Sequence, residues 1–314
     1  MATKVFSTAT FSIATPTRDS LAKLRRCVGS IRGQHEVVLE HLVQDAQSTD
    51  GTADWLCGQA ALHAELRWVS EADGGMYDAI NRAWSRAGGR YLSWLNSDEQ
   101  YLPGALAQVQ ACFEANPAVD VVSGDFLVTD AQGLAVALRR EIPLRSFYVA
   151  NTHLNTMTCT LFYRRELWDR GLLKLDSRYR YAADKDLVLR LLNAGARFHH
   201  LPVVLSTFGI DGTNLSTHAG MAAEAERIRL AYGAFRWRPL RGLAFGARRT
   251  ERLLRGCYQK VDMHYRYALD EMPRYALFQT KGLGSRYALS NDHGHAERVG
   301  ATAAATQTRF EGPP

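Results

Sequence analysis

The sequence lacks the short motifs that mark several large enzyme classes. No G-x-G-x-x-G follows the first predicted strand, so the usual dinucleotide-binding loop is excluded. The phosphate-loop pattern G-x-x-x-x-G-K-[ST] and the hydrolase pattern G-x-S-x-G are missing from the 314 residues as well. Dehydrogenase, P-loop and serine-hydrolase chemistry therefore find no support here.

Long apolar runs and paired cysteines are also absent. No run of about 18 apolar residues occurs, so we expect no membrane-spanning helix. The start of the chain lacks the apolar core of a signal peptide. The five cysteines are scattered without a C-x-x-C pair, which is typical of reduced, buried thiols and not of a disulfide framework or a zinc site. These features indicate a cytoplasmic protein.

Positive charge is concentrated in one segment. The formal net charge is +6, yet residues 227–260 contain ten Lys or Arg and one acid, Glu251, so the rest of the chain is acidic. Aromatic and aliphatic residues such as Trp237 and Leu243 are interleaved with the basic ones, which fits a helix lying on an anionic membrane face. A solvated basic helix packed on the main domain explains the segment equally well. Nothing in the remaining sequence resembles a base-reading module, so we expect no nucleic-acid partner.

Strands and helices alternate along the first part of the chain. Strand patterns at residues 5–14, 37–43, 66–69, 91–95 and 119–122 are separated by segments with helical spacing of apolar residues. This alternation predicts an α/β fold built from βαβ units, with a mostly parallel sheet and helices on both faces.

Polar loops follow the first four predicted strands, at Arg18, Asp45, Asp73 and Asp98. The carboxyl ends of parallel strands meet at one edge of a sheet, so we expect these loops to converge on a shared ligand site. After Leu95 the side chains of Asn96, Ser97, Asp98 and Glu99 all carry oxygen. Such ligands suit Mg²⁺ or Mn²⁺ held together with substrate phosphates. The same residues also suit a helix cap before Pro103, and this segment alone does not decide between the two.

Five ordered motifs resemble the inverting nucleotide-sugar glycosyltransferases of family 2, which adopt the GT-A fold with its Rossmann-like sheet. The motifs are residues 11–17 (FSIATPT), 44–52 (QDAQSTDGT), 70–82 (SEADGGMYDAINR), 95–99 (LNSDE) and 181–191 (YAADKDLVLRL). The resemblance covers about residues 9–216 and is specific because the motifs occur together and in order.

The resemblance implies a division of the chain. Residues 5–220 would form the catalytic domain, with residues 5–125 binding the nucleotide sugar and residues 126–220 binding the acceptor. Residues 221–290 would form a basic helical extension. Residues 291–314 are poor in apolar side chains and are predicted to be disordered.

By resemblance, the residues that bind the nucleotide sugar come from the loops after the strands. They are Thr15, Pro16, Arg18, Asp45, Asp73, Asn81, Arg82, Asn96 and Ser97. Asp45 and Asp73 would contact the nucleotide, although each also suits a role in stabilising a turn. Arg82 and Asn81 would contact phosphate or position their loop, and a solvent-exposed Arg82 is an equally good interpretation.

Asp98 matches the metal-binding carboxylate that holds the cation bridging the diphosphate. The sequence departs from the family here, because Asn96 replaces the first acid of the Asp-x-Asp motif and Glu99 follows where a second Asp is common. One carboxylate remains compatible with Mg²⁺ or Mn²⁺. We expect metal binding to be weak without nucleotide.

Asp184 matches the catalytic base, placed at the start of a predicted helix where the helix dipole stabilises its anion. Its alternative role is to cap that helix. Asp186 lies about 200° further around the helix and cannot share its direction. The family more often has Glu where this chain has Ala183, which leaves the choice between Asp184 and Asp186 open. His153 and Asp186 are candidates for the acceptor side.

The expected function is metal-dependent, inverting transfer of a sugar, of the hexosyltransferase type, from a nucleotide-diphosphate sugar to a hydroxyl. The resemblance favours a UDP-sugar. The basic segment, if it lies on a membrane, favours a lipid-linked saccharide acceptor in bacterial surface polysaccharide synthesis, at the inner face of the cell membrane. One alternative is a catalytically silent scaffold protein of the same fold at the membrane periphery. Another is a nucleotidyltransferase, but its Gly-rich, basic first loop does not match Thr15-Pro16-Thr17-Arg18.

Overall fold

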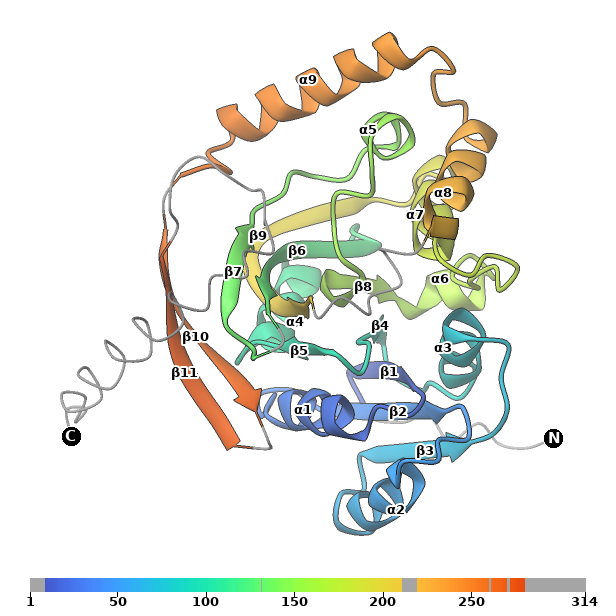
Figure 1. The fold of residues 1–314 in the computed structure, drawn as a ribbon, viewed down its shortest axis with the longest axis vertical. Coiled ribbons are helices and arrows are strands. Elements are labelled where there is room, and N and C mark those ends of the chain that lie inside the picture. The colour runs from blue at the N-terminus through green and yellow to red at the C-terminus, as the bar shows by residue number, and fades with distance from the viewer. Residues whose placement is uncertain (1–8, 131, 211–218, 260, 270–271, 280–314) are drawn as a thin grey trace.

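The computed structural model describes residues 9–130, 132–210, 219–259, 261–269 and 272–279. One large sheet runs through the main domain, with helices on both faces (Figure 1). The predicted disordered tail lies outside the described residues. Within them, no helix is long and apolar enough to cross a membrane.

The main sheet has nine strands in the order β3-β2-β1-β4-β8-β6-β9-β5, with β7 paired to β6. The strands are β1 (Phe11–Thr17), β2 (Leu39–Asp45), β3 (Leu66–Ser70), β4 (Tyr91–Trp94), β5 (Glu99–Tyr101), β6 (Val121–Thr129), β7 (Ala135–Arg139), β8 (Leu161–Arg164) and β9 (Phe198–Gly209). Strands β1 to β4 are parallel to one another, and β6 is parallel to β9. Strand β8 runs antiparallel between β4 and β6. The predicted α/β architecture is confirmed.

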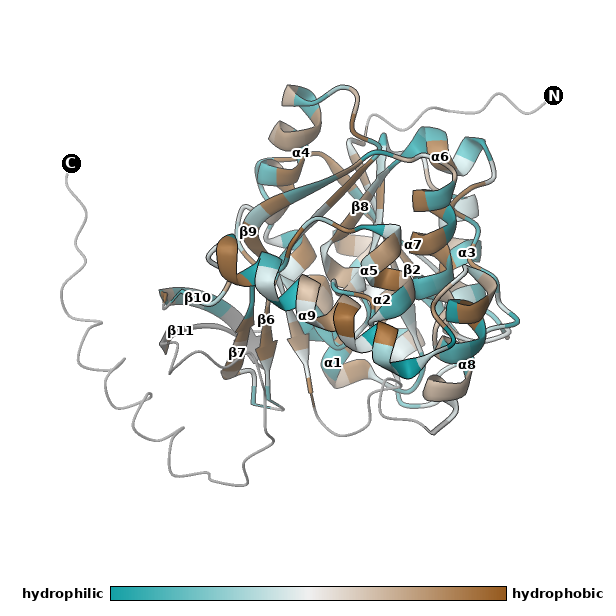
Figure 2. Cartoon of the chain, turned by 90° about the horizontal axis from the view of Figure 1, so that it is seen from above, coloured by the Kyte–Doolittle hydropathy of each residue, from teal (hydrophilic) through white to brown (hydrophobic). Residues whose placement is uncertain are grey.

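The helices follow the strands as the sequence predicts. They are α1 (Leu21–Arg32), α2 (Thr52–Leu62), α3 (Met76–Ser85), α4 (Ala105–Ala115), α5 (Ser146–Asn151), α6 (Arg165–Asp169), α7 (Ala183–Asn193), α8 (Ala219–Ala231) and α9 (Arg238–Leu254), with a 3₁₀ turn at Thr158–Thr160. The strands of the sheet are largely apolar, and the sheet lies between the helices that cover its two faces (Figure 2).

The two faces of the sheet bury separate apolar clusters. Phe11 and Ile13 of β1 pack with α1 and α4, whereas Ala14 packs with α3 and α7 on the other face. Successive side chains of a strand point to opposite faces, so β1 contributes to both clusters. In the second cluster the rings of Trp84 and Trp94 lie 5.3 Å apart. The carboxyl end of β4 is therefore held between two packed layers.

The C-terminal extension differs from the prediction in its later part. It is helical through α8 and α9, but β10 (Asp262–Leu269) and β11 (Met272–Gln279) form an antiparallel hairpin where a helix was expected. The side chains of Met263 and Tyr265 pack against the main domain, and those of Asp262 and His264 are exposed. This period of two is that of a strand, and the basic composition of the preceding segment obscured it.

Gly89, just before β4, is required by a close approach of two backbones. Its N–H donates to Ser12 Oγ at 2.7 Å and to the buried Glu40 Oε1 at 3.2 Å. A Cβ at this position would lie 2.7 Å from the Phe11 carbonyl carbon and the Ser12 nitrogen, which are backbone atoms that cannot easily move. Only glycine fits between β1 and the start of β4.

We expect Gly89→Ala to lower the free energy of unfolding by about 1–3 kcal/mol, because overpacking forces backbone shifts of this cost. Gly58→Ala is the control: Gly58 lies in α2 with no atom near the added methyl, and alanine there should stabilise by about 0.5–1 kcal/mol. Urea unfolding of both variants measures the difference. If Gly89→Ala and Gly58→Ala were equally stable, glycine would not be required where β1 approaches the start of β4.

Candidate active site

The carboxyl ends of β1, β2, β3 and β4 lie side by side at one edge of the sheet. Thr17 is in register with Asp45, and Asp45 with Ser70. On the other side of β1, the Leu95 N–H donates to the Ala14 carbonyl at 2.9 Å. The four polar loops predicted from the sequence therefore converge.

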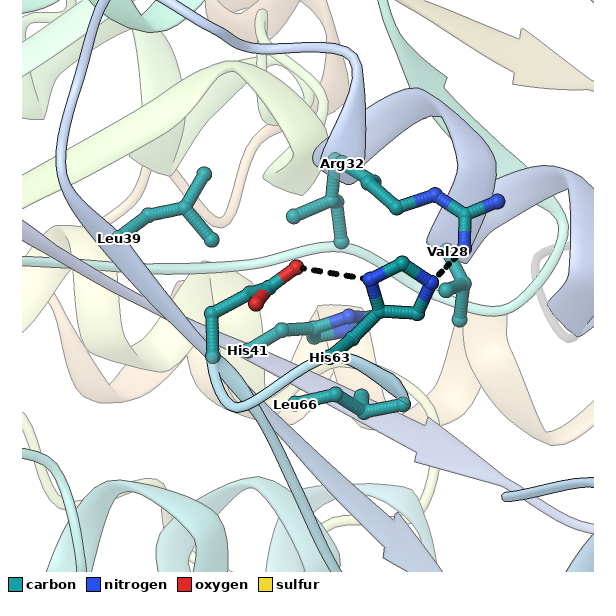
Figure 3. A pocket seen from close by; sticks show the side chains of 8 residues that line it. Val28, Arg32, Leu39, His41, His63 and Leu66 are labelled. Carbon is teal, nitrogen blue, oxygen red and sulfur yellow. Dashed lines mark hydrogen bonds and ion pairs between the residues drawn. The ribbon is translucent and has the colours of Figure 1, made fainter. Parts of the chain in front are cut away.

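A small hollow lies at the opposite edge of this sheet, near the first residues of β2 and β3. It is lined by Leu39 and Leu66, the first residues of those strands, together with Val28, Arg32, His41 and His63 (Figure 3). Its volume of about 10 Å³ accommodates no more than one water molecule. A hollow of this size is too small to hold a nucleotide sugar.

Asp45 is fully buried and its carboxylate is held by two serines. Ser48 Oγ donates to Asp45 Oδ1 at 2.5 Å, and Ser70 Oγ donates to Oδ2 at 2.6 Å. The carboxylate thus joins the loop after β2 to the end of β3. Sequence reasoning missed both serines, although each lies inside one of the quoted motifs. Asp45 stabilises its turn as well as standing at the predicted nucleotide position.

The first two loops are locked together by a further set of hydrogen bonds. The Asp19 N–H donates to Ser48 Oγ at 2.8 Å, and the Thr49 N–H donates to Asp19 Oδ1 at 2.7 Å. The Leu21 N–H donates to Asp50 Oδ2 at 2.8 Å. Asp19 and Gln47 adopt positive φ angles of 46° and 57°, a backbone conformation that costs about 1–2 kcal/mol per residue. These bonds hold the strained loops in one shape.

The predicted residues of the first loop differ in accessibility. Thr15 and Pro16 are buried within β1, and Thr15 Oγ1 lies 2.9 Å from His41 Nε2. Arg18 is exposed beyond the end of the strand. Its positive charge is close enough to favour the ionised form of Asp73. Of the three, Arg18 is the side chain free to approach a ligand.

Asp73 lies in the third loop, half-buried, and its Oδ1 accepts a hydrogen bond from the Gly75 N–H at 2.8 Å. Burial raises the pKa of Asp73, and the bond from Gly75 opposes that shift. Arg82 braces the same loop: its Nε donates to Asp78 Oδ2 and its Nη1 to Glu71 Oε1, both at 2.9 Å. Arg82 is therefore engaged with its own loop, the second of the two roles predicted for it.

Asn81 is turned into the protein. Its Nδ2 donates to the Leu175 carbonyl at 2.8 Å, and its Oδ1 accepts from the Leu175 N–H at 2.9 Å. The amide thereby ties α3 to the segment that precedes α7. These two bonds engage both ends of the amide, so Asn81 acts on the site through the position of that segment.

The loop after β4 gathers oxygen atoms that lack partners. The Asn96 N–H donates to Glu99 Oε2 at 2.8 Å, whereas the buried atoms Asn96 Oδ1 and Glu99 Oε1 accept no hydrogen bond within the described part of the chain. Burial, and then the charge of Asp98, raise the pKa of Glu99 to about 8. Asp98 and Ser97 are half-buried between them. Unsatisfied acceptor oxygens beside a carboxylate are the donor set that a hard cation prefers.

Protein side chains alone do not enclose a metal in this loop. Among the residues that the structure describes, no group of three or more His, Cys, Asp or Glu side chains is arranged to hold one. Mg²⁺ and Mn²⁺ sites of phosphate-handling enzymes use one or two carboxylates and take their other ligands from phosphates and water. The residues around Asp98 fit that kind of site.

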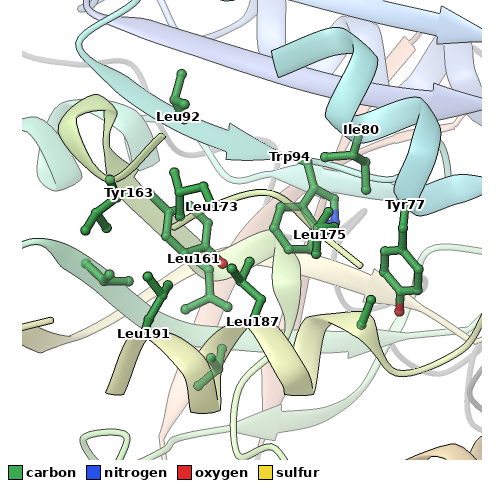
Figure 4. Packing of buried hydrophobic residues seen from close by; sticks show 14 of the residues in the cluster. Tyr77, Ile80, Leu92, Trp94, Leu161, Tyr163, Leu173, Leu175, Leu187 and Leu191 are labelled. Carbon is green, nitrogen blue, oxygen red and sulfur yellow. The ribbon is translucent and has the colours of Figure 1, made fainter. Parts of the chain in front are cut away.

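Asp184, at the start of α7, faces the third loop. The Tyr77 hydroxyl donates to Asp184 Oδ1 at 3.4 Å, and the Lys185 N–H donates to the same oxygen at 2.8 Å. Tyr77 projects from α3 towards α7, beside Trp94 (Figure 4). Burial raises the pKa of Asp184, and both hydrogen bonds oppose the shift. Tyr77 comes two residues after Gly75, so it brings this carboxylate to the loop of Asp73.

The side chains of Asp186 and Lys185 lie in surroundings different from those of Asp184. Asp186 Oδ1 accepts a hydrogen bond at 2.9 Å from the hydroxyl of Tyr232, the residue just after α8, away from the third loop. Lys185 is only 3% exposed, and burial followed by the charge of Arg229 lowers its pKa to about 8. Sequence reasoning missed Lys185, because a lysine in an amphipathic helix gives no sign that it is buried.

His153 lies between α5 and α9. Arg248 Nη1 is 2.9 Å from its Nε2, and the ring of Phe245 lies 5.9 Å away. His153 is an exposed residue, and partial loss of hydration, followed by the neighbouring guanidinium of Arg248, lowers the pKa of its imidazole. The imidazole is neutral at physiological pH and accepts a hydrogen bond from the guanidinium.

Comparison with known proteins identifies the sequence family. A sequence model of Glycosyl transferase family 2 matches residues 12–171. A PGL/p-HBAD biosynthesis glycosyltransferase of Mycobacterium tuberculosis is 31% identical over 202 residues, covering 62% of this chain and 75% of that protein. An uncharacterized glycosyltransferase of Nostoc is 22% identical over 218 residues, covering 67% of each.

Solved structures share the fold. S. aureus TarS in complex with UDP-GlcNAc superposes with a TM-score of 0.59 at 16% identity, covering 78% of this chain and 72% of that chain. The mannosyltransferase PcManGT from Pyrobaculum calidifontis, in complex with GDP-Man and Mn²⁺, gives a TM-score of 0.54 at 19% identity, covering 71% and 63%. The GT-A architecture expected from the motifs is confirmed.

We expect Asn81→Ala to lower the free energy of unfolding by about 1–3 kcal/mol, because it leaves the buried Leu175 N–H and carbonyl without partners. Asn193→Ala is the control, since the exposed Asn193 only accepts a bond from Ser146 and should change stability by less than about 0.5 kcal/mol. Chemical denaturation measures both. If Asn81→Ala weakened nucleotide binding without loss of stability, Asn81 would contact the ligand directly.

Proposed function

The chain belongs to glycosyltransferase family 2, and we propose that it transfers a sugar from a nucleotide-diphosphate sugar to a hydroxyl with inversion at the anomeric carbon. One observation carries the proposal: the half-buried carboxylate of Asp184 accepts a hydrogen bond from Tyr77, in the first turn of the helix that follows the loop after β3. A candidate base and the predicted nucleotide loops therefore share one edge of the sheet.

The donor would lie across the four loops. Asp45 and Asp73 stand at the positions where the family contacts the nucleotide, and Arg18 is exposed beside them. The hydrogen bonds among the loops of Asp19 and Ser48 fix this surface before any ligand arrives, which reduces the entropy lost on binding. TarS binds UDP-GlcNAc and PcManGT binds GDP-Man, and we favour a UDP-sugar on the motifs.

The diphosphate would be placed at the loop after β4. Asp98, with the neutral oxygen Asn96 Oδ1, would hold a Mg²⁺ or Mn²⁺ ion there. When bound, the ion would neutralise the negative charge that develops on the leaving diphosphate. Asn96 can supply a neutral oxygen where the family motif has an acid, so the site carries less negative charge and would bind the ion mainly together with the nucleotide.

Asp184 would act as the general base. It accepts the proton of the acceptor hydroxyl as that oxygen forms a bond to the anomeric carbon. The bond from the anomeric carbon to the diphosphate oxygen breaks in the same displacement, and its electrons leave with the nucleoside diphosphate. Tyr77 and the Lys185 N–H orient the Asp184 carboxylate. Its raised pKa makes it a stronger base than an ordinary aspartate.

The acceptor would enter from the side of α5, α7 and α9. His153 lies there, next to Arg248, and Asp186 is bound to Tyr232 at the edge of that region. We infer a lipid-linked saccharide acceptor at the cytoplasmic face of a membrane, in the synthesis of a surface polysaccharide. The match to a PGL/p-HBAD biosynthesis glycosyltransferase and the basic segment at residues 227–260 support this acceptor class.

Nucleotide and metal binding are tested by thermal-shift titration with UDP, GDP, ADP and dTDP, each with and without Mn²⁺. We expect one nucleotide to raise the unfolding temperature, and more so with Mn²⁺, because a ligand at one hundred times its Kd stabilises the native state by about 2.7 kcal/mol. The Mn²⁺-dependent part should vanish in Asp98→Ala and persist in Asp54→Ala, an exposed acid on α2. No shift with any nucleotide would favour the scaffold alternative.

Asp184→Asn should reduce kcat/KM by about 10²–10⁴-fold, the range for loss of a general base. The same variant should unfold at a higher temperature near pH 7. Because the folded pKa of Asp184 is raised, its ionised form costs stability above that pKa, and the cost disappears as the pH falls through it. The gain in unfolding temperature should therefore shrink at acidic pH. An active Asp184→Asn enzyme would exclude Asp184 as the base.

A further inference from the structure

Helix α9 turns several of its arginines towards the protein. Arg248 is 4% exposed, and its Nη2 lies 2.7 Å from the buried Glu141 Oε2. Arg252 is equally buried and lies 3.6 Å from Glu141 Oε1. Arg241 pairs with Glu226 of α8 at 2.7 Å. Arg248 and Arg252 attach α9 to the catalytic domain, and Arg241 attaches it to α8, so these three cations are not available to a partner.

The outward face of α9 is apolar. Leu243, Leu253 and Leu254 are 70%, 60% and 83% exposed. Leu243 and Leu254 are eleven residues apart, close to three helical turns, so they point in the same direction. The exposed residues between them on this face are small: Gly246, Ala247 and Thr250. We call Leu243, Leu253 and Leu254 with these small residues the leucine face; apolar positions recur along α9 in Figure 2.

Cations flank the leucine face. Arg236, Arg238 and Arg249 are exposed, and none makes an ion pair with another residue in the part of the chain that the structure describes. Trp237 is exposed among them. Leucines bordered by arginines and a tryptophan are the arrangement of helices that lie in the interface of an anionic bilayer.

The charge pattern distinguishes a bilayer from a second copy of the chain. In a two-fold symmetric dimer the same patch meets itself, so the unpaired arginines would face one another. Like charges brought together in this way oppose association. Anionic lipid headgroups provide the complementary charge, and the acyl chains accept the leucines.

We propose that the leucine face of α9 docks on an anionic lipid bilayer. The apolar side chains enter the boundary between headgroups and acyl chains, and Arg236, Arg238 and Arg249 bind headgroup phosphates. Arg248, on the inner side of the same helix, contacts His153 at 2.9 Å. The docked helix would therefore hold the acceptor side of the site against the membrane, a consequence that rests on the lipid-linked acceptor proposed above.

The test is flotation of the full-length protein with vesicles of phosphatidylglycerol and phosphatidylcholine in equal parts. The triple variant Leu243→Gln, Leu253→Gln, Leu254→Gln should lose more than about tenfold in partitioning, given the apolar area that it withdraws from the bilayer. Leu62→Gln is the matched control, because Leu62 is 75% exposed on α2 and should leave partitioning unchanged.

Arg249→Gln should weaken partitioning about fivefold, from the roughly 1 kcal/mol that each basic residue near an anionic surface contributes. Its control is Arg170→Gln, an exposed arginine just beyond α6. Unchanged flotation of the triple leucine variant, or absence of wild-type flotation, would overturn the proposal. So would a wild-type dimer in sedimentation analysis that the leucine substitutions dissociate.

Nucleotide-induced thermal shifts separate this proposal from the proposed function. The leucine variants change exposed side chains only, so they should keep the wild-type unfolding temperature and the wild-type nucleotide response. Flotation without any nucleotide response would leave the docking face standing and reject the transferase function. A nucleotide response without flotation would reject the docking face and leave the transferase function standing.

Discussion

The parallel register of β1 to β4 is the constraint on which the site depends. It places the ends of four strands at one edge, so that residues from distant parts of the sequence become neighbours. Asp45 and its two serines then join two of the loops, and Tyr77 joins α3, the helix after the third loop, to α7. Packing of Trp84 and Trp94 fixes the strand that carries the loop of Asp98. The fold supplies geometry, and the loops supply the chemistry.

Buried charge has a different use in the C-terminal helices. Glu141 attracts two buried arginines of α9, and Glu226 attracts a third. Breaking the buried pair of Glu141 with Arg248 would leave an uncompensated charge at a cost of about 3–5 kcal/mol, so this contact strongly restrains the orientation of the helix. The pair of Arg241 with the partly exposed Glu226 contributes less. That orientation turns leucines outward, the reverse of the usual arrangement in a soluble protein. The exposed apolar surface is thus a consequence of where the acids lie.

The sequence predicts much of the fold because period and motif are local signals. The strand end at Asp45, the polar loop of Asp98 after β4, and the helix that begins beside Asp184 are read from such patterns. Contacts between residues distant in sequence cannot be read from local patterns. Nothing in the local sequence indicates that Asn81 binds the backbone of Leu175, or that Arg248 rather than Arg249 pairs with Glu141. The β10–β11 hairpin shows the same limit, because its alternating side chains meet the main domain across a long separation. Roles in binding and catalysis came from resemblance and remain predictions.

Diffraction from crystals grown with UDP and Mn²⁺, recorded at the manganese absorption edge, tests the central claim most directly. We expect an anomalous peak at about 2.0–2.2 Å from an Asp98 carboxylate oxygen, the distance at which small divalent cations bind oxygen. We also expect the nucleotide diphosphate at the same edge of the sheet, on the side of Asp184. A nucleotide bound elsewhere, or a metal peak without contact to the loop after β4, would contradict the account.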